Sequence, residues 1–418
     1  MRWLAALLAC LLAGPALGGG IAWQPAVEIA AGRAERGPWR QNESRYDYVD
    51  DPSVAIGDDE SVAVVWVDQG RKDVFFRRLG AGPAVNISRS PDTFSWLPRV
   101  VMTDSRHVFV LWQEIIFSGG SHGGDILFAR SEDGGASFSV PVNLSNSRAG
   151  DGKGRINKDV WHNGSLDLAA GANGRLYAAW TEYEGLLWVA RSNDGGKRFA
   201  PLVRIADAKP ARGPSLAVAP DGAVYLAWTV GEDERADIRV AKSTDGGTTF
   251  SAPRLVGHNK ARSDAPKAYS DAPKLAVDAH GTLHLAYAEA SSILYTRSTD
   301  GALSFSSPRA ISKPNAGFPS LALDANGGVY VVWENSQDPR RRPRGLGFAL
   351  SRDAGGSFSE PAVIPGSADS RGGWNGSFQG LLMRKLSVSR GGEIAVVNSS
   401  LKDGERSRVW MVRGQSPN

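Results

Sequence analysis

The chain has 418 residues and a nearly balanced charge, with 48 Lys and Arg residues against 44 Asp and Glu residues. This balance argues against a dedicated nucleic-acid-binding protein, which usually carries a strong basic excess. The 49 glycines, 13 tryptophans and many short β-branched runs favour an all-β chain.

The first residues have the pattern of a secretory signal peptide. Arg2 precedes the apolar run Leu4–Leu12, and small residues follow, which predicts cleavage after Gly18. A lipoprotein site at Cys10 is the alternative, although the apolar stretch before it is short. The sequence therefore predicts a signal peptide at 1–18, one domain at 19–418, and a secreted or periplasmic protein without a membrane span. Cys10 is the only cysteine, so we expect the mature chain to fold without disulfides.

A hairpin module repeats along the rest of the chain. Two short apolar strands around an Asp/Gly turn begin near residues 52, 98, 165, 214, 273, 319 and 386. A third strand follows each hairpin, and a fourth strand follows in every repeat except the last. This pattern predicts a single β-propeller of seven four-stranded blades, with six blades as the alternative.

The missing strand of the last repeat has a candidate at the other end of the chain. Residues 23–30, WQPAVEIA, share the pattern of residues 358–365, FSEPAVIP. We therefore predict that the N-terminal strand completes the last blade, which closes the ring and covers an open sheet edge.

A second module, Ser-x-Asp-x-Gly-x-Thr-Phe, lies between the third and fourth strands. It starts at Ser131, Ser192, Ser243, Ser298 and Ser351, with small departures in two copies. Glycine can supply a positive φ there, and the Ser and Asp side chains can bond the turn's own backbone amides. The Phe is expected to cover the hairpin from below. We therefore interpret these aspartates as turn formers rather than catalytic carboxylates.

This motif is the Asp-box, or BNR repeat, and residues 45–413 resemble the sialidase-like Asp-box propellers. The resemblance implies carbohydrate binding, with an acidic glycan among the candidate ligands and no cofactor or metal. If the protein is an enzyme, the resemblance implies a sialidase-like glycoside hydrolase with an arginine clamp, a Tyr nucleophile and an Asp acid/base. The chain departs from sialidases in its seven repeats, because sialidases have six blades. It also has Asp50, Asp51 and Pro52 where they have an Arg-Ile-Pro element.

The strand alternation assigns the connections to two faces. The first-to-second turns and the Asp-boxes share one face, and every long insertion falls on the other, which we call the long-loop face. These insertions are 31–51, 89–97, 115–125, 145–164, 257–272, 336–345 and 365–384. Because long loops on a rigid scaffold carry most binding residues, the long-loop face is the predicted binding face.

One position of the repeat supplies most of the candidate site. Residues two before the proline of an inner strand are expected at the channel mouth, namely Asp50, Trp96, Arg212, Asp271 and Gly317. Arg212 is the first candidate for gripping a ligand carboxylate, because a guanidinium can bind it in bidentate fashion. Asp271 is the candidate acid/base, with Tyr269 and Glu182 behind it. Loop capping by these residues is the alternative.

Other candidates remain open at this point. Trp161, His162 and Trp374 lie in long loops, where an aromatic ring either stacks on a sugar or fills the core of its own loop. Acids that end the second strands either line the cavity rim or bond a neighbouring blade: Asp68, Glu114, Glu182, Glu289 and Glu334. The basic run at 338–345 is interpreted as a solvated loop, with attraction of a polyanion as the alternative.

The partner predictions follow from these residues. A glycan or other carbohydrate is the expected partner of a monomer. The alternative is a non-catalytic propeller that serves as a scaffold for another envelope or secreted protein.

Overall fold

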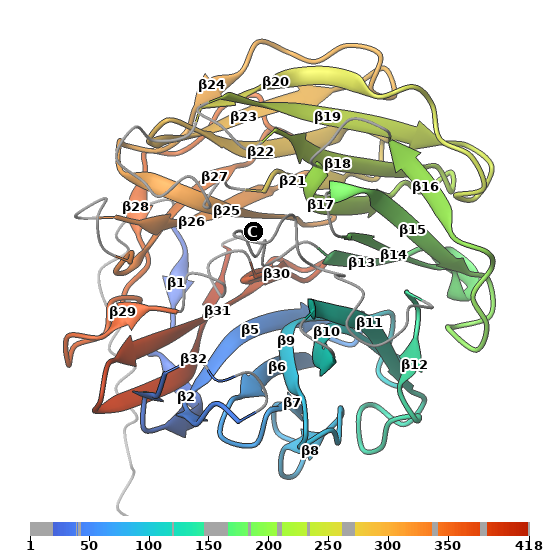
Figure 1. The fold of residues 1–418 in the computed structure, drawn as a ribbon. Coiled ribbons are helices and arrows are strands. Elements are labelled where there is room, and N and C mark those ends of the chain that lie inside the picture. Colours follow the sequence, from blue (N-terminus) through green and yellow to red (C-terminus); the bar gives the residue numbers. More distant parts are fainter. Residues whose placement is uncertain are drawn as a thin grey trace, which may run out of the picture.

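The computed structural model describes residues 20–38, 40, 43–118, 121–145, 166–182, 185–206, 211–231, 235–260, 272–336, 342–376 and 383–416. These residues form seven antiparallel sheets arranged as the blades of a propeller around a central channel, plus one short ribbon (Figure 1). The seven-bladed prediction is confirmed, and the six-bladed alternative is wrong. The predicted signal peptide lies outside the described residues. None of the helical segments within them is long and apolar enough to cross a membrane.

Each blade runs from an inner strand at the channel to an outer strand at the rim. Blade 1 consists of β5 (Val49–Ile56), β6 (Val62–Asp68), β7 (Asp73–Arg78) and β8 (Val85–Asn86). Blade 2 consists of β9 (Phe94–Met102), β10 (Val108–Ser118), β11 (Ser121–Ser131) and β12 (Val142–Asn143). Blade 3 consists of β13 (Leu166–Ala170), β14 (Leu176–Thr181), β15 (Leu187–Ser192) and β16 (Val203–Ala206).

Blades 4 to 6 repeat this order. Blade 4 consists of β17 (Ala211–Val218), β18 (Val224–Val230), β19 (Arg235–Ser243) and β20 (Arg254–Lys260). Blade 5 consists of β21 (Lys274–Val277), β22 (Leu283–Glu289), β23 (Ser292–Ser298) and β24 (Arg309–Ala310). Blade 6 consists of β25 (Ala316–Leu323), β26 (Val329–Asn335), β27 (Leu346–Ser351) and β28 (Ala362–Val363).

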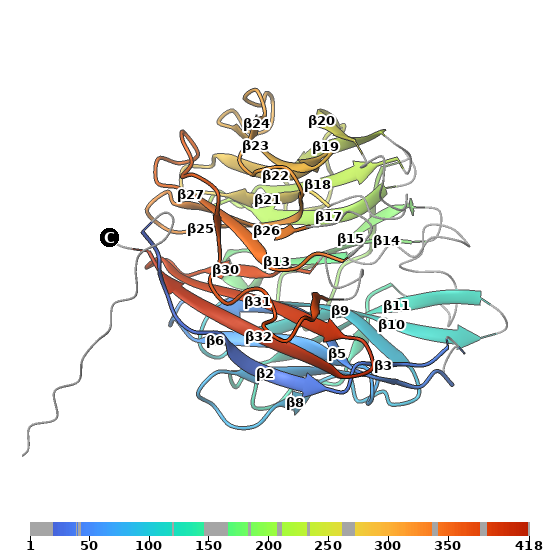
Figure 2. The same cartoon turned by 90° about the vertical axis from the view of Figure 1, so that its left-hand side faces the viewer.

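Blade 7 combines both ends of the chain. It contains β29 (Trp374–Asn375), β30 (Leu386–Val388), β31 (Glu393–Lys402), β32 (Arg406–Gln415), β1 (Ala22–Trp23) and β2 (Val27–Gly32). Strand β2 pairs with β32 from Val27 opposite Met411 to Gly32 opposite Ser407, and both views show the two strands side by side (Figure 2). The predicted closure of the ring by the N-terminal strand is confirmed. Inner strands β30 and β5 also contact each other at this seam.

The hydrophobic core lies between neighbouring blades. The sheets of blades 1 and 2, for example, bury Val65, Val110 and Trp112 between them. Five second strands carry a tryptophan at the same position of the repeat, each at most 4% exposed: Trp66, Trp112, Trp180, Trp228 and Trp333. A blade buries its apolar faces only against its two neighbours, so the ring stabilises each blade.

Inner strands of adjacent blades are also joined by side-chain hydrogen bonds at one repeat position. The Leu216 amide donates to Asp167 Oδ2 at 2.9 Å, and the Leu275 amide donates to Ser215 Oγ at 3.0 Å. The Lys385 amide donates to Ser320 Oγ at 3.3 Å in the same way. These bonds satisfy backbone amides that face the next blade and hold neighbouring inner strands in register.

The two kinds of short turn lie on one face, as the strand alternation predicts. The Gly134 amide in an Asp-box donates to the Arg106 carbonyl in the first-to-second turn of the same blade at 2.8 Å. Blade 3 repeats this contact between Gly195 and Gly174, at 2.9 Å. The 3₁₀ turn η1 (Ala172–Gly174) belongs to that connection.

The Asp-box carboxylates hold their own turns. Asp353 accepts bonds from the Ser357 hydroxyl, the Ser357 amide and the Ser351 hydroxyl, each at 2.7 Å. These donors, led by the Ser357 hydroxyl, lower the pKa of Asp353 to about 2. The turn-forming interpretation of these aspartates is confirmed.

The Phe of the Asp-box has a different role from the one expected. Phe138 packs edge-on against Phe76 of the preceding blade, with ring centroids 5.1 Å apart. Phe199 meets Phe128 at the same distance, and Phe358 meets Tyr295 at 4.8 Å. The ring therefore bridges two blades instead of covering its own hairpin, because the third strand of the preceding blade presents an aromatic there.

Two predicted long loops contain strand structure. Residues 115–118 and 121–125 extend the β10–β11 hairpin, with Ile115 paired to Gly124 and Ser118 to Ser121. Residues 31–51 contain a two-stranded ribbon of β3 (Glu35–Arg36) and β4 (Tyr46–Asp47). The described residues of both insertions therefore include cross-strand pairing, which extends a blade in the first case and forms a separate sheet in the second.

Candidate functional site

Several predicted site residues lie outside the described residues. These are Tyr269, Asp271, Trp161 and His162. Their proposed roles stay predictions. The described part of the candidate site consists of the inner-strand ends that face the long-loop side.

The repeat position before the proline has an unusual backbone in four blades. Asp51, Leu97, Gly213 and Phe318 have φ values of 53°, 58°, 54° and 53°, in the left-handed region. In all four of these blades the inner-strand register also shifts at this point. A bulge of this kind twists the strand and re-aims its side chains, and strained backbone of this type often marks functional sites.

The residues just before these bulges are buried. Asp50 is 1% exposed, Arg212 2% and Trp96 7%. The Asp50 carboxylate accepts a hydrogen bond from the Ser399 hydroxyl of blade 7. Asp50 therefore faces the seam between blades 7 and 1, whereas the sequence predicts that it lies at the open channel mouth.

A cluster of three charged side chains, a carboxylate between two arginines, spans the channel. Asp167 Oδ1 lies 2.6 Å from Arg384 Nη2 and 3.8 Å from Arg99 Nε. Arg384 Nη2 also donates to the Leu168 carbonyl at 3.0 Å. These residues come from the start of blade 7, from blade 2 and from blade 3, so the cluster ties opposite parts of the ring together. We call Arg99, Asp167 and Arg384 the channel bridge.

Burial shapes the electrostatics of the channel bridge. Desolvation lowers the pKa of Arg99 to about 10, and the Asp167 charge opposes this shift. Arg99 therefore remains a cation at neutral pH. Its Nη1 also contacts the sulfur of Met383 at 2.9 Å. A guanidinium removed from water interacts strongly with any anion that reaches it.

A second buried network lies beside the first. Lys385 forms an ion pair with Glu334, and Asn375 Nδ2 and Asn398 Nδ2 donate to the same carboxylate at 2.6 and 3.1 Å. Glu334 ends the second strand of blade 6, and its partners belong to blade 7. Of the two roles left open for the second-strand acids, Glu334 has the structural one.

Glu114 and Glu182 are two of the other acids that end second strands. Glu114 accepts from Ser95 Oγ at 2.8 Å and from Trp112 Nε1 at 3.0 Å, within its own blade. Glu182 is half-buried, and its amide donates to the Leu186 carbonyl in the turn after β14. Its proposed place behind an acid/base stays a prediction, because Asp271 is not described.

Asp51 carries a buried carboxyl whose pKa is strongly raised. It is 1% exposed, and Oδ2 accepts from the Leu97 amide at 3.2 Å. Oδ1 has no hydrogen-bond partner among the described residues. Desolvation raises the pKa of Asp51 well above its ordinary value, the Asp50 charge adds to the rise, and Arg99 and Lys385 oppose it.

The arginines of the basic run are not all solvated. Arg342 is 9% exposed, donates to the Gly376 carbonyl and lies 3.4 Å from Asp403. Arg344 Nη2 donates to the Asp369 carbonyl at 2.7 Å. The solvated-loop interpretation is wrong for these two residues, because both guanidiniums fold back onto blade 7. Trp374 is half-buried in β29, next to the Glu334 network.

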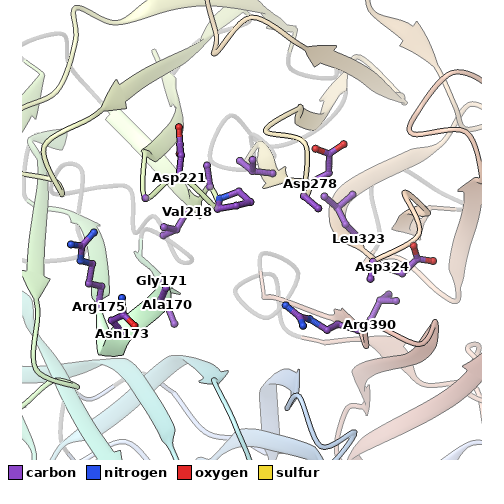
Figure 3. A pocket seen from close by; sticks show the side chains of 18 residues that line it. Ala170, Gly171, Asn173, Arg175, Val218, Asp221, Asp278, Leu323, Asp324 and Arg390 are labelled. Carbon is purple, nitrogen blue, oxygen red and sulfur yellow. The ribbon is translucent and has the colours of Figure 1, made fainter.

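The Asp-box face holds cavities that sequence reasoning did not identify. A cavity of about 590 Å³ opens between the first-to-second turns, where Asp221, Asp278 and Asp324 line one arc (Figure 3). A deeper cavity of about 300 Å³ shares the wall residues Val218 and Val277 with it. We call the two together the Asp-box funnel. Binding residues are expected on long loops, so short turns carry no signal in the sequence for such a cavity.

The comparisons with known proteins show the fold. No protein-family model matches the sequence, and neither does any curated protein. A solved structure of YCF48 bound to D1 peptide is similar, with a TM-score of 0.51, 14% identity, and coverage of 98% of this chain and 100% of that chain.

Carbohydrate-active proteins are also among the similar structures. A Trypanosoma rangeli sialidase has a TM-score of 0.50 and 11% identity over 93% of this chain and 59% of that chain. A polysaccharide lyase, an ulvan lyase, has a TM-score of 0.51 and 12% identity over 75% and 79%. The chain therefore has the fold of the sialidase-like Asp-box propellers.

Proposed function

We propose that this protein is exported and binds an acidic carbohydrate at the long-loop end of its channel. The observation that carries the proposal is the presence of three arginines at that end of three inner-strand segments: Arg99 and Arg212, which are buried, and Arg384, whose side chain is 29% exposed. They belong to blades 2, 4 and 7. Buried guanidiniums fixed by backbone are suited to hold a carboxylate or sulfate in bidentate fashion.

The position of Asp167 supports this proposal. Its carboxylate lies between Arg99 and Arg384, which shows that the two guanidiniums can share one anion. A ligand carboxylate would approach these two guanidiniums from the long-loop side, and Arg212 would be its first contact. The bulges at Asp51 and Gly213 hold the neighbouring backbone in place.

Whether the protein turns its ligand over is a separate part of the proposal. An exo-glycosidase mechanism would use Asp271 as acid/base with Tyr269 and Glu182 nearby. Trp161, His162 and Trp374 would then supply stacking surfaces for sugar rings. The fold shared with a sialidase and an ulvan lyase is compatible with such chemistry, although one fold carries many functions.

The test combines a glycan array with a fluorogenic sialoside assay, using the wild type, Arg212→Ala and Arg212→Lys. Loss of one charge-assisted bond should weaken binding about ten- to a hundredfold in Arg212→Ala. Arg212→Lys should recover part of it, because the charge stays but the bidentate geometry is lost. Turnover abolished in Arg212→Ala would identify an enzyme. Binding without turnover would identify a lectin-like propeller, and the absence of both would contradict the proposal.

A second candidate function is supported by a specific likeness. The structure of YCF48 bound to D1 peptide is similar over nearly the whole length of both chains. A non-catalytic propeller that binds another envelope or secreted protein is therefore the alternative. It predicts no response on the glycan array and a stable complex with a protein co-purified from the native host.

A further inference from the structure

We propose that Lys385 and Asn398 form an intramolecular isopeptide bond, with Glu334 as the carrier of protons. The bond would link Nζ of Lys385 to Cγ of Asn398 and release ammonia. None of these three residues belongs to the proposed carbohydrate site, so the modification is independent of it. Its basis is the place of Asn398 in the repeat, the burial of the three residues and the contacts that they share.

Asn398 occupies a position of the repeat that is aromatic in the other blades. The second strands of blades 1, 2, 3, 4 and 6 carry a buried tryptophan there, and that of blade 5 carries Tyr287. In blade 7 the corresponding residue is Asn398, which is 0% exposed. A buried carboxamide costs free energy unless its polar atoms are bonded, and it packs less apolar surface than a ring. Packing of the core therefore does not explain an asparagine at this position.

The partners of Asn398 come from two blades. Glu334 lies near the end of β26 in blade 6, Lys385 directly precedes β30 in blade 7, and both are 1% exposed. Lys385 Nζ forms an ion pair with Glu334 Oε1, and Asn398 Nδ2 donates to the same oxygen at 3.1 Å. One carboxylate oxygen therefore holds the amine and the carboxamide next to each other.

This arrangement supplies what aminolysis of a carboxamide requires. Glu334 Oε1 contacts both the attacking and the leaving nitrogen, so one group can take a proton from the first and deliver it to the second. The Ser399 amide donates to Asn398 Oδ1 at 2.9 Å, and this bond would stabilise the negative charge that develops on the oxygen. A desolvated lysine amine is a recognised nucleophile.

The bonds and protons of the step balance without a further reagent. Glu334 accepts a proton from Nζ of Lys385, and the neutral amine forms a bond to Cγ of Asn398. Glu334 gives this proton to Nδ2, the Cγ–Nδ2 bond breaks, and ammonia leaves. Nζ loses its second proton to Glu334, so the products are a secondary amide, ammonia and a neutral carboxylic acid. The loss of ammonia lowers the mass of the chain by about 17 Da.

A second asparagine contacts the same carboxylate but has a different role. Asn375 Nδ2 donates to the other oxygen, Glu334 Oε2, at 2.6 Å, and to the Gly345 carbonyl at 3.1 Å. Asn375 Oδ1 accepts from the Gly345 amide at 3.3 Å. Both ends of this carboxamide therefore hold the segment that leads into β27, and Asn398 is the acceptor in the reaction.

The surroundings favour bond formation over hydrolysis. Leu386 and Val396, close in sequence to Lys385 and Asn398, belong to an apolar core together with Val332 of blade 6. Such a core excludes the water that would compete for the carboxamide. Burial also penalises both charges of the ion pair, which favours transfer of the proton to Glu334. Groups held in this way react as at a very high effective concentration, and each chain needs to react only once.

Peptide mapping of the folded mature protein tests the proposal. Trypsin should not cleave after Lys385, and residues 385–390 should be recovered linked to 391–402, about 17 Da below the summed mass of the two peptides. Cleavage after Lys402, which forms an exposed ion pair with Glu405 at 2.7 Å, is the internal control. Recovery of residues 386–390 as a free peptide in full yield would overturn the proposal. A link between 385–390 and 372–384 would contradict the choice of Asn398 over Asn375.

Variants test the role of each group. Lys385→Arg keeps a cation beside Glu334 but offers no amine, and Glu334→Gln keeps the shape of the side chain but cannot carry the proton. Both variants should show no linked peptide and no loss of mass. Glu405→Gln removes the carboxylate of the exposed pair and should be linked like the wild type. Circular dichroism and thermal unfolding check the fold. A folded Glu334→Gln protein that is still linked would contradict the role of Glu334, and if that variant does not fold, the wild-type map decides.

Discussion

Buried charges at the long-loop end of the channel determine how single residues respond to substitution. Asp167, Glu334 and Asp51 are all ionisable and almost fully removed from water. The first two have cationic partners within ion-pair distance, whereas Asp51 Oδ1 has no hydrogen-bond partner in the described part of the chain. Removal of a charged partner should therefore destabilise the protein, whereas neutralising Asp51 should not.

Asp51→Asn should stabilise the protein in a pH-dependent way. A raised carboxyl pKa contributes stability below the unfolded pKa of about 3.9, and this stability is lost as pH rises through the folded pKa. The amide does not ionise, so the variant should unfold a few degrees above wild type at pH 8, with a smaller difference at pH 4. Differential scanning calorimetry across pH measures this. The exposed Asp58→Asn is the control, and a difference that grows toward low pH would contradict the assignment.

Asp167→Asn should have the opposite effect and should lower the stability of the protein. The variant leaves Arg99 buried without its counter-charge, and breaking a buried ion pair in this way costs about 3 kcal/mol or more. Glu28→Gln removes the partner of Arg406 at an exposed pair, and should cost less than about 1 kcal/mol. Urea unfolding of both variants gives the comparison. Equal effects would show that the channel bridge is no more stabilising than a surface pair.

At the scale of elements, the Asp-box joins its own blade to the preceding one. Its Ser and Asp hold the turn, its Phe packs on the aromatic of the preceding blade, and its glycine lies against the same ring. A Cβ at Gly135 would lie 2.0 Å from Phe76 Cε1, and the φ of Gly135 is 91°. Glycine at position 135 therefore meets two separate requirements, backbone conformation and space, whereas the copy at Ser298 has Ala302 at this position with a φ of 72°.

A comparison of Gly135→Ala with Gly195→Ala should separate the cost of the backbone conformation from the cost of the steric contact. Gly195 also has a positive φ, of 70°, but a Cβ there meets no atom within 4 Å. Conformational strain alone should destabilise Gly195→Ala by about 1 kcal/mol. Gly135→Ala should lose roughly 1–3 kcal/mol more, because Phe76 is buried and cannot move aside freely. Urea unfolding measures both, and equal losses would mean that the ring of Phe76 yields to the methyl group.

Strands and turns were predictable because each depends on neighbours in sequence. Alternating apolar residues and Asp/Gly turns indicate hairpins locally, and the recurrence of Ser243 to Phe250 in other repeats indicates one structural role. The contact of Phe138 with Phe76 was missed, since the two rings are brought together only by the stacking of blades. The strand extension at 115–125 was missed because its composition resembles a loop.

The candidate site was less predictable than the fold for a related reason. Arg212 and Asp50 were proposed from their place in the repeat, but Arg99, Asp167 and Arg384 carry no local motif. Asp167 and Arg384 are 217 positions apart in sequence and meet only after the ring has closed. The Asp-box funnel was missed since its lining consists of ordinary turn residues, whose convergence at one mouth is a property of the whole ring.

At the scale of the whole molecule, the ring depends on the strand supplied by the N-terminus. Strands β1 and β2 cover β32, and Ile29 is buried together with Val49 and Met411 in the core between blades 7 and 1. Without them, β32 would present unpaired backbone groups and an apolar face to water. The unpaired backbone groups and the exposed apolar face would both lie at the seam where the two ends of the chain meet.

Deletion of residues 20–32 should therefore destabilise the entire propeller rather than one blade. Each blade is stabilised by its neighbours, so an opened seam should lower the thermal unfolding temperature sharply and produce soluble aggregates through the exposed edge of β32. Scanning calorimetry and size-exclusion chromatography measure the two effects. Val27→Ala is the matched control, because Val27 lies in β2 but is 49% exposed. A deletion variant that stays monomeric and unfolds at the temperature of the Val27→Ala protein would show that β30 and β5 close the ring without the N-terminal strand.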